Sequence, residues 1–123
     1  MCGIVGLYLK NPALQSQLGL LFEPMLIAMT DRGPDSAGFA IYGDEVADNW
    51  IKLTLRHHNL HYNSQALADA LTGELGCEIQ WFSNHCVAVF KIASEAKTAH
   101  AFIDRFDPEL LVLSAGQSIE ILK

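Results

Sequence analysis

The order of apolar patterns between residues 51 and 115 constrains the fold more than any other feature of this sequence. Alternating apolar and polar side chains predict strands, whereas apolar side chains three or four residues apart predict helices. The expected elements are, in order, a strand, a helix, two strands joined by the hairpin turn 83–85, a helix and a strand: Ile51–Arg56, Ser64–Leu75, Glu78–Phe82, Cys86–Lys91, Ser94–Phe106 and Leu110–Ala115. This β-α-β-β-α-β order predicts an α+β protein with a ferredoxin-like unit over residues 50–123.

Polar and glycine residues mark the expected ends of these elements. Ser64 and Ser94 are typical helix N-caps, and Gly76 is typical of the residue that follows a helix. Gly116 and Gln117 predict a tight turn that leads into a last strand over Ser118–Leu122.

The first 49 residues show a different organisation. A buried strand is expected over Ile4–Leu9, followed by a helix that begins at Asn11 and Pro12. Pro24 should end or kink that helix, because proline lacks an N–H group and clashes with the preceding turn. A second strand is expected over Ala37–Tyr42, and the acidic segment 43–49 predicts a domain boundary.

Composition excludes several classes of function. Half of the residues are hydrophobic, 18% are charged and the net charge is −6, which favours a packed core and argues against binding to nucleic acid or to an acidic membrane surface. The longest apolar stretch, 18–29, contains Glu23 and Pro24 and is too short to span a bilayer. Three cysteines cannot form a closed set of disulfides, and no basic leader precedes Cys2, so the expected location is the cytoplasm.

Cys2 is the first candidate for chemistry. Removal of Met1 would give Cys2 a free α-amine, which titrates near pH ~7.7–8.0 and can act as a general base beside its own thiol. The alternative interpretation is a small buried residue at the start of a strand.

Segment 31–38, with the sequence DRGPDSAG, is the second candidate. Gly33 permits backbone conformations that other residues avoid, and the Arg32 guanidinium offers five donors in a fixed fork. Asp35 could orient Arg32 or cap a turn. The alternative interpretation is a solvated loop with an Arg–Asp pair of little energetic value.

Together, the opening MCGIVGL and the segment DRGPDSAG resemble the class II glutamine amidotransferases, which are N-terminal-nucleophile (Ntn) hydrolases with an αββα fold. The chain is most similar to the small amidotransferase subunit of glutamate-synthase-like and N-methylglutamate-synthase-like complexes. The resemblance implies that Cys2 attacks glutamine and that ammonia passes to synthase subunits. It also implies that Arg32 braces the backbone next to Cys2 and helps to shape the pocket, with Gly33 and Asp35 shaping its loop and Gly3 as a further structural or substrate-binding residue. It implies no metal or organic cofactor for this chain.

The chain departs from this family in two motifs. It contains no His-Thr-Arg sequence, which would bind the substrate carboxylate, and no Asn-Gly pair, which would form the oxyanion hole. We therefore expect an N-terminal part of a longer domain that is inactive alone and self-associates through uncovered apolar surfaces. The alternative is a non-catalytic interaction or regulatory module built on the ferredoxin-like unit.

Three further groups of residues have simpler interpretations. His57, His58 and His61 lie close together but lack the spacing of a zinc motif, so no metal site is predicted. Cys77 and Cys86 flank the expected hairpin and could face each other, although ordinary packing is the interpretation we favour. Trp81 and Phe82 must point to opposite faces of one strand, which with few nearby cations argues against an RNA platform.

Overall fold

The computed structural model describes residues 3–32 and 37–122, with only the backbone of Leu122. The chain divides into two compact units, one up to Ala37 and one from Gly38 onward. Each unit is described by itself. Within the described residues, no helix is long and apolar enough to cross a membrane.

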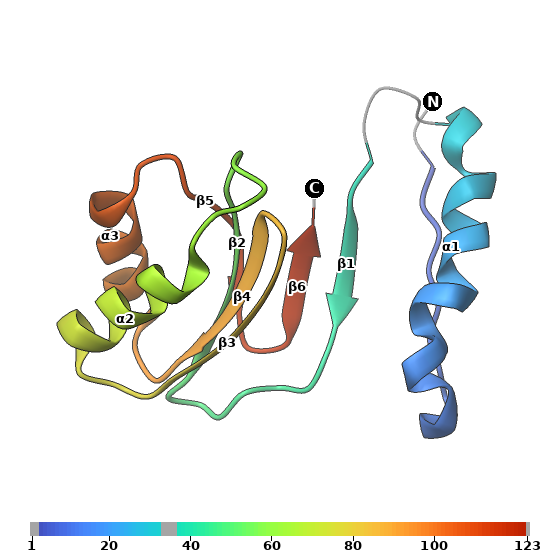
Figure 1. Cartoon of the computed structure of the whole chain (residues 1–123). Helices are drawn as coiled ribbons and strands as arrows, with labels where there is room; N and C mark the ends of the chain where they lie inside the picture. The colour runs from blue at the N-terminus through green and yellow to red at the C-terminus, as the bar shows by residue number, and fades with distance from the viewer. Residues whose placement is uncertain (1–2, 33–36, 123) are drawn as a thin grey trace. The chain divides into compact units, whose positions relative to one another are not determined.

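The first unit combines an extended segment with one helix (Figure 1). Its elements are the 3₁₀ helix η1 (Pro12–Gln17), α1 (Leu18–Ala28) and the 3₁₀ turn η2 (Thr30–Arg32). Asn11 caps η1 as predicted, with its Oδ1 accepting from the N–H of Ala13 at 3.1 Å. None of the residues of these three elements is buried.

One prediction for this unit, the strand over Ile4–Leu9, is wrong. Residues 4–9 are extended but form no strand, because no described strand supplies a hydrogen-bonded partner for them. Alternate side chains are nevertheless half-buried, at Val5, Leu7 and Leu9. Of the two outcomes predicted for Pro24, an end of the helix or a kink, the end does not occur, since α1 continues through Pro24 to Ala28. Pro24 is exposed, so water can hydrate the backbone carbonyl that it leaves unpaired.

The second unit contains a four-stranded antiparallel sheet in the order β3-β4-β2-β5. The predicted β-α-β-β-α-β succession is confirmed: β2 (Ile51–Arg56), α2 (Ser64–Leu75), β3 (Ile79–Asn84), β4 (Val87–Ile92), α3 (Ala96–Phe106) and β5 (Leu111–Gly116). Gly76 ends α2 with a φ of 59°, a left-handed conformation that favours glycine.

The predicted N-caps of both helices are wrong by one residue. Asn63, not Ser64, caps α2, and its Oδ1 accepts from the N–H of Ala66 at 3.1 Å. Glu95 rather than Ser94 precedes α3, and it makes no side-chain cap hydrogen bond. Asparagine and serine are comparable N-caps, so the pattern around Asn63 and Ser64 does not decide between them.

A two-stranded antiparallel sheet completes this unit. It pairs β1 (Phe39–Tyr42) with β6 (Ile119–Leu122), and Tyr42 lies opposite Ile119. The predicted last strand is thus present, but its partner comes from the far end of the sequence, not from the neighbouring β5. The structure is accordingly α+β with two antiparallel sheets.

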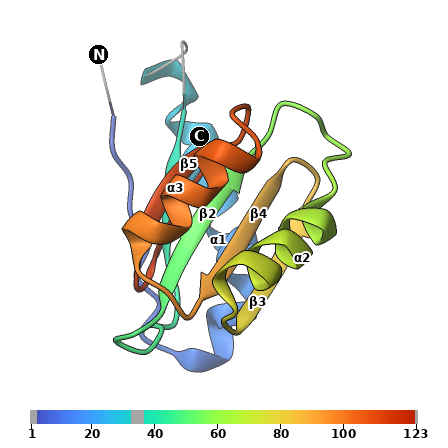
Figure 2. The same cartoon turned by 90° about the vertical axis from the view of Figure 1, so that its left-hand side faces the viewer.

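Both long helices of this unit cover one face of the four-stranded sheet (Figures 1 and 2). The buried core between them is formed by side chains from α2, α3, the sheet and the turn before β5: Leu53, Leu55, Leu67, Ala68, Leu71, Ala88, Phe90, Ile92, Ala99, Phe102, Ile103 and Leu110. The helices contribute through residues on one stripe each, as amphipathic helices do.

Lys52 points to the opposite face of the sheet and is only 2% exposed. Its ammonium lies 3.1 Å from the carboxylate of Glu120 and donates to the backbone carbonyl of Asp44 at 3.0 Å. A buried charge requires such compensation. The ion pair therefore fastens β6 to β2.

Candidate functional site

Two of the predicted site residues lie within the described part of the chain. These are Gly3 and Arg32, whereas Cys2, Gly33 and Asp35 fall outside it. The two described residues are 29 positions apart in the sequence, yet the fold of the first unit brings them together.

Gly3 lies against the end of this unit's helical segment. A side-chain carbon built at Gly3 would lie 3.3 Å from Cβ of Arg32 and 3.5 Å from its Cδ, and would overlap the terminal methyl group of Met29. A larger residue at position 3 would therefore require the Met29 side chain to move and Arg32 to shift by a few tenths of an ångström. Glycine at position 3 permits the close approach without either shift.

Arg32 ends the short turn η2, whose backbone is anchored to α1. The N–H of Arg32 donates to the carbonyl of Met29 at 2.9 Å. The arginine is exposed, so its guanidinium can reach a ligand. The contact with Gly3 places the aliphatic part of the Arg32 side chain beside the residue that follows Cys2 in the sequence.

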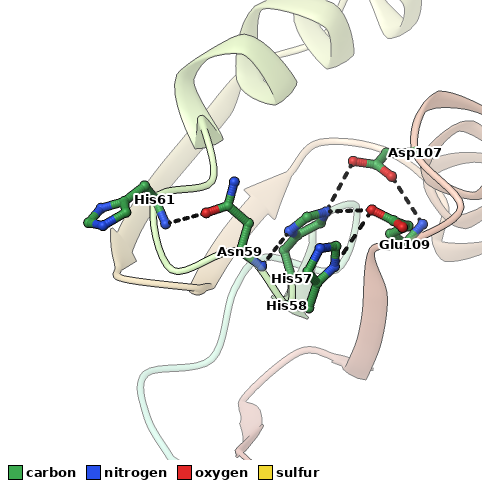
Figure 3. Close-up of polar contacts among 6 residues, drawn as sticks. All are labelled: His57, His58, Asn59, His61, Asp107 and Glu109. Atoms are coloured by element: carbon green, nitrogen blue, oxygen red, sulfur yellow. Dashed lines mark hydrogen bonds and ion pairs between the residues drawn. The ribbon is translucent and has the colours of Figure 1, made fainter.

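A second group of polar side chains gathers where β2 ends and β5 begins (Figure 3). Nε2 of His57 lies 3.6 Å from Oδ2 of Asp107 and 3.6 Å from Oε2 of Glu109. Nδ1 of His58 lies 3.6 Å from the same Glu109 oxygen. We call His57, His58, Asp107 and Glu109 the histidine–carboxylate cluster.

Backbone hydrogen bonds explain why these side chains meet. The N–H of His57 donates to the carbonyl of Cys86 at 2.8 Å, which extends the pairing of β2 with β4 by one residue. The N–H of Glu109 donates to Oδ1 of Asp107 at 3.0 Å, a local turn that holds both carboxylates on one loop. The ends of the two loops thus face each other.

Tyr62 supports the cluster from the loop before α2. Its ring stacks on His57, with ring centroids 4.4 Å apart. Burial and the adjacent Asp107 carboxylate, which accepts a hydrogen bond from the phenol, raise the pKa of Tyr62 to about 12. The phenol is thus a hydrogen-bond donor at neutral pH.

His61 does not join the other two histidines. Its backbone N–H donates to Oδ1 of Asn59 at 2.9 Å, and its ring points away from the cluster (Figure 3). The residue that groups with His57 and His58 is instead Glu109, which local sequence spacing could not indicate.

The two remaining pairs of candidate residues, two aromatic residues and two cysteines, lie on β3 or near its ends. Trp81 is half-buried and stacks on Phe90, whereas Phe82 is 56% exposed, so the prediction that they face opposite sides is confirmed. Cys77 precedes β3 and Cys86 follows it. A strand of this length spans roughly 20 Å, at about 3.3 Å per residue, which argues against the alternative that the two thiols face each other. Both cysteines are free and half-buried, in agreement with the favoured interpretation of ordinary packing.

Comparison with known proteins adds a separate line of information. No family model matches the chain, and no solved structure matches it at a significant level. All of the chain aligns with "Glutamine amidotransferase-like protein GlxB" of Rhizobium meliloti, at 39% identity over 124 residues and 40% of that protein. It also aligns in full with "Putative glutamine amidotransferase" of Methanothermobacter thermautotrophicus, at 32% identity over 132 residues and 43% of that protein.

The chain thus spans about two fifths of the length of these curated relatives. Both alignments include the segments that carry Cys2 and Arg32, since they extend over the whole chain. The two relatives support a glutamine amidotransferase family for this chain.

Proposed function

We propose that this chain is the nucleophile-bearing part of a class II, Ntn-type glutamine amidotransferase. The observation that carries the proposal is the 39% identity, over the full chain, to a protein named glutamine amidotransferase-like. The proposed reaction converts glutamine to glutamate and delivers ammonia to synthase subunits of the glutamate-synthase-like or N-methylglutamate-synthase-like kind.

In the proposed reaction, the α-amine of Cys2 accepts the thiol proton while sulfur attacks the side-chain carbonyl of glutamine. The C–N bond breaks, the amine returns the proton to the leaving nitrogen, and ammonia departs from a thioester. Water, deprotonated by the same amine, then attacks the thioester and releases glutamate and the free thiol. The amine suits both proton transfers because its ordinary pKa lies near the working pH.

Arg32 has a positioning role in this proposal. Its packing against Gly3 supports the idea that it braces the backbone at Cys2, with Gly33 and Asp35 shaping the rest of the loop. A larger residue at position 3 would displace Arg32 or Met29 and shift the nucleophile with them. Small displacements of this kind are costly for catalysis, since reacting atoms must be closely aligned.

We assign residues 50–123 to a ferredoxin-like insert. The antiparallel order β3-β4-β2-β5, with two helices on one face, supports that assignment. We further propose that the 123-residue chain alone does not hydrolyse glutamine, because it contains neither His-Thr-Arg nor Asn-Gly. Loss of an oxyanion-hole donor alone reduces the rate by about 10²–10³.

The intact mass of the purified chain tests the nucleophile after incubation with a diazoketone analogue of glutamine. Loss of Met1 and one adduct that is absent in Cys2→Ala, yet retained in Cys77→Ala and Cys86→Ala, would support a Cys2 nucleophile. Retention of Met1, or an adduct that persists in Cys2→Ala, would contradict it. Ammonia release by the isolated chain that depends on Cys2 would contradict the proposed inactivity.

An interaction module remains the second candidate, because the buried core of the described residues lies entirely in the second unit. In that case Cys2→Ala would leave partner binding and biological activity unchanged.

Self-association of the chain is expected under both proposals. Strand β3 is an edge of its sheet and carries no charged residue to discourage pairing. A monomer by light scattering at working concentration would contradict self-association.

A further inference from the structure

We propose that His57, His58 and Glu109 bind one divalent metal ion of the Zn²⁺ type. The three side chains each present one ligand atom, and these atoms lie within 4.8 Å of one another. Two come from the segment after β2 and the third from the segment before β5, so the folded second unit assembles the site (Figure 3).

The spacing of the ligand atoms fits a tetrahedral metal. The Glu109 oxygen is 3.6 Å from Nε2 of His57 and 3.6 Å from Nδ1 of His58. Two ligands of a tetrahedral zinc ion, each about 2.0–2.2 Å from the metal, lie about 3.3–3.6 Å apart, so both histidine–carboxylate distances fit such a site. The two histidine nitrogens lie within 4.8 Å of each other. Direct hydrogen bonds between these atoms would be shorter, near 2.7–3.2 Å.

The chemistry of the donors selects the class of metal. Two imidazoles and one carboxylate suit zinc and its neighbours, whereas Ca²⁺ and Mg²⁺ prefer sets of oxygen ligands. Three protein ligands leave a fourth position for water or a ligand. His58 and Glu109 have side chains that are 69% and 66% exposed, so an ion can enter from solvent.

The surroundings hold the buried ligand in place. The His57 side chain is 7% exposed and is stacked on Tyr62. Asp107, whose Oδ2 lies 3.6 Å from the same His57 nitrogen, faces the site and adds negative charge. Its other oxygen fixes the backbone of Glu109, so the carboxylate ligand is supported as well.

One contact sets the form of the metal-free site. Nδ1 of His57 accepts a hydrogen bond from the N–H of Asn59 at 2.9 Å, so the proton of the neutral ring is on Nε2. A metal at Nε2 moves that proton to Nδ1 and breaks the contact with Asn59. The site therefore binds its ion more weakly than a closed structural zinc site does, and binding changes the tautomer of His57.

The test is calorimetric titration of the untagged full chain with zinc chloride, and separately with magnesium chloride. We expect one zinc ion per chain, no magnesium binding, and at least a tenfold loss of zinc affinity in His58→Ala and in Glu109→Gln. His61→Ala and His100→Ala are matched controls that should retain the affinity. Circular dichroism verifies that each variant is folded, and the exposed positions of His58 and Glu109 favour this outcome.

A spectroscopic measurement separates this site from capture by cysteines. With Co²⁺ in place of zinc, ligation by nitrogen and oxygen gives no thiolate charge-transfer band. Nitrogen-15 spectra of the imidazoles should show Nε2 of His57 protonated without metal and metal-bound afterwards. Absence of binding, binding unaffected by His58→Ala and Glu109→Gln, or a thiolate band would each overturn the proposal.

Discussion

The two units of this chain contrast in how they bury apolar side chains. In the first, α1 is rich in leucine, isoleucine and methionine, yet none of its residues is buried, and Leu20 is 73% exposed. In the second, twelve residues form one continuous core. The motifs that suggest catalysis are in the first unit, whereas the interactions that stabilise a fold are in the second.

The residues proposed for catalysis and the residues that stabilise the fold therefore lie in different units. A helix that is apolar on all sides is typically buried, so α1 has the composition of a core helix without the cover of one in the described structure. The second unit has the opposite character, since apolar residues of α3 occupy one stripe and face its sheet. We expect the second unit to dominate the unfolding transition of the whole chain.

The largest expected effect comes from a matched pair of leucines. Leu71→Ala in α2 removes a side chain that is 0% exposed and should lower the free energy of unfolding by about 2–5 kcal/mol. Leu20→Ala in α1 should change it by less than about 0.5 kcal/mol. Urea denaturation measures both. Equal losses would show that α1 is packed within the same cooperative core.

The next effect concerns the ion pair of Lys52 with Glu120. Lys52→Met leaves Glu120 and the Asp44 carbonyl without their donor, and should lower stability by about 1–3 kcal/mol. The control is Arg105→Met, since the Arg105–Glu74 pair is exposed and contributes about 0–1 kcal/mol. Thermal unfolding compares the two variants, and equal shifts would contradict a special role for the buried pair.

Tyr62 gives a smaller effect that depends on pH. Its pKa is raised in the folded chain, so the stabilisation is complete below pH 10, the ordinary value, and disappears as pH rises through about 12. The free energy of unfolding of Tyr62→Phe should therefore decrease less steeply with pH than that of the parent chain between pH 10 and 12. It should also lose the most alkaline phase of tyrosine ionisation. An unchanged titration curve would contradict the raised pKa of Tyr62, which burial and then Asp107 produce.

The smallest effect distinguishes the two units by their helix caps. Asn63→Ala removes the cap of α2 and should lower the free energy of unfolding by about 1 kcal/mol. Asn11→Ala removes the equivalent contact at η1, and should leave the global transition unchanged. Amide hydrogen exchange measures both variants. A global loss in Asn11→Ala would show that the first unit unfolds together with the second.

Local patterns were sufficient to predict the order of elements from residue 51 onward. Alternation in the strands and apolar spacing in the helices arise from neighbouring residues, and Gly76 marks a helix end by its own conformational freedom. Features that depend on distant residues were not accessible. The pairing of β1 with β6 is one, and the absence of a partner for residues 4–9 is another.

The candidate sites also combine features that local sequence predicts with features that depend on distant residues. Cys2 and Arg32 were chosen from sequence motifs, and the contact between Gly3 and Arg32 could only come from the fold. His57 and His58 were visible as neighbours, but Glu109 is about 50 residues further on and has no signature of its own. A spacing rule detects ligands on one element, not ligands on two loops that meet in space.

The pairing of Tyr42 with Ile119 also bears on how this chain can be altered. The N–H of Gly43 donates to the carbonyl of Ser118 at 3.1 Å, so the ladder continues just beyond the two strands. The segment that connects β1 to β6 therefore begins and ends at neighbouring points, which is the geometry that tolerates domain insertion. Residues 43–118 thus form one long connection whose two ends lie side by side at the β1–β6 pair. A foreign domain whose termini lie close together could be joined to β1 and β6 at the same place.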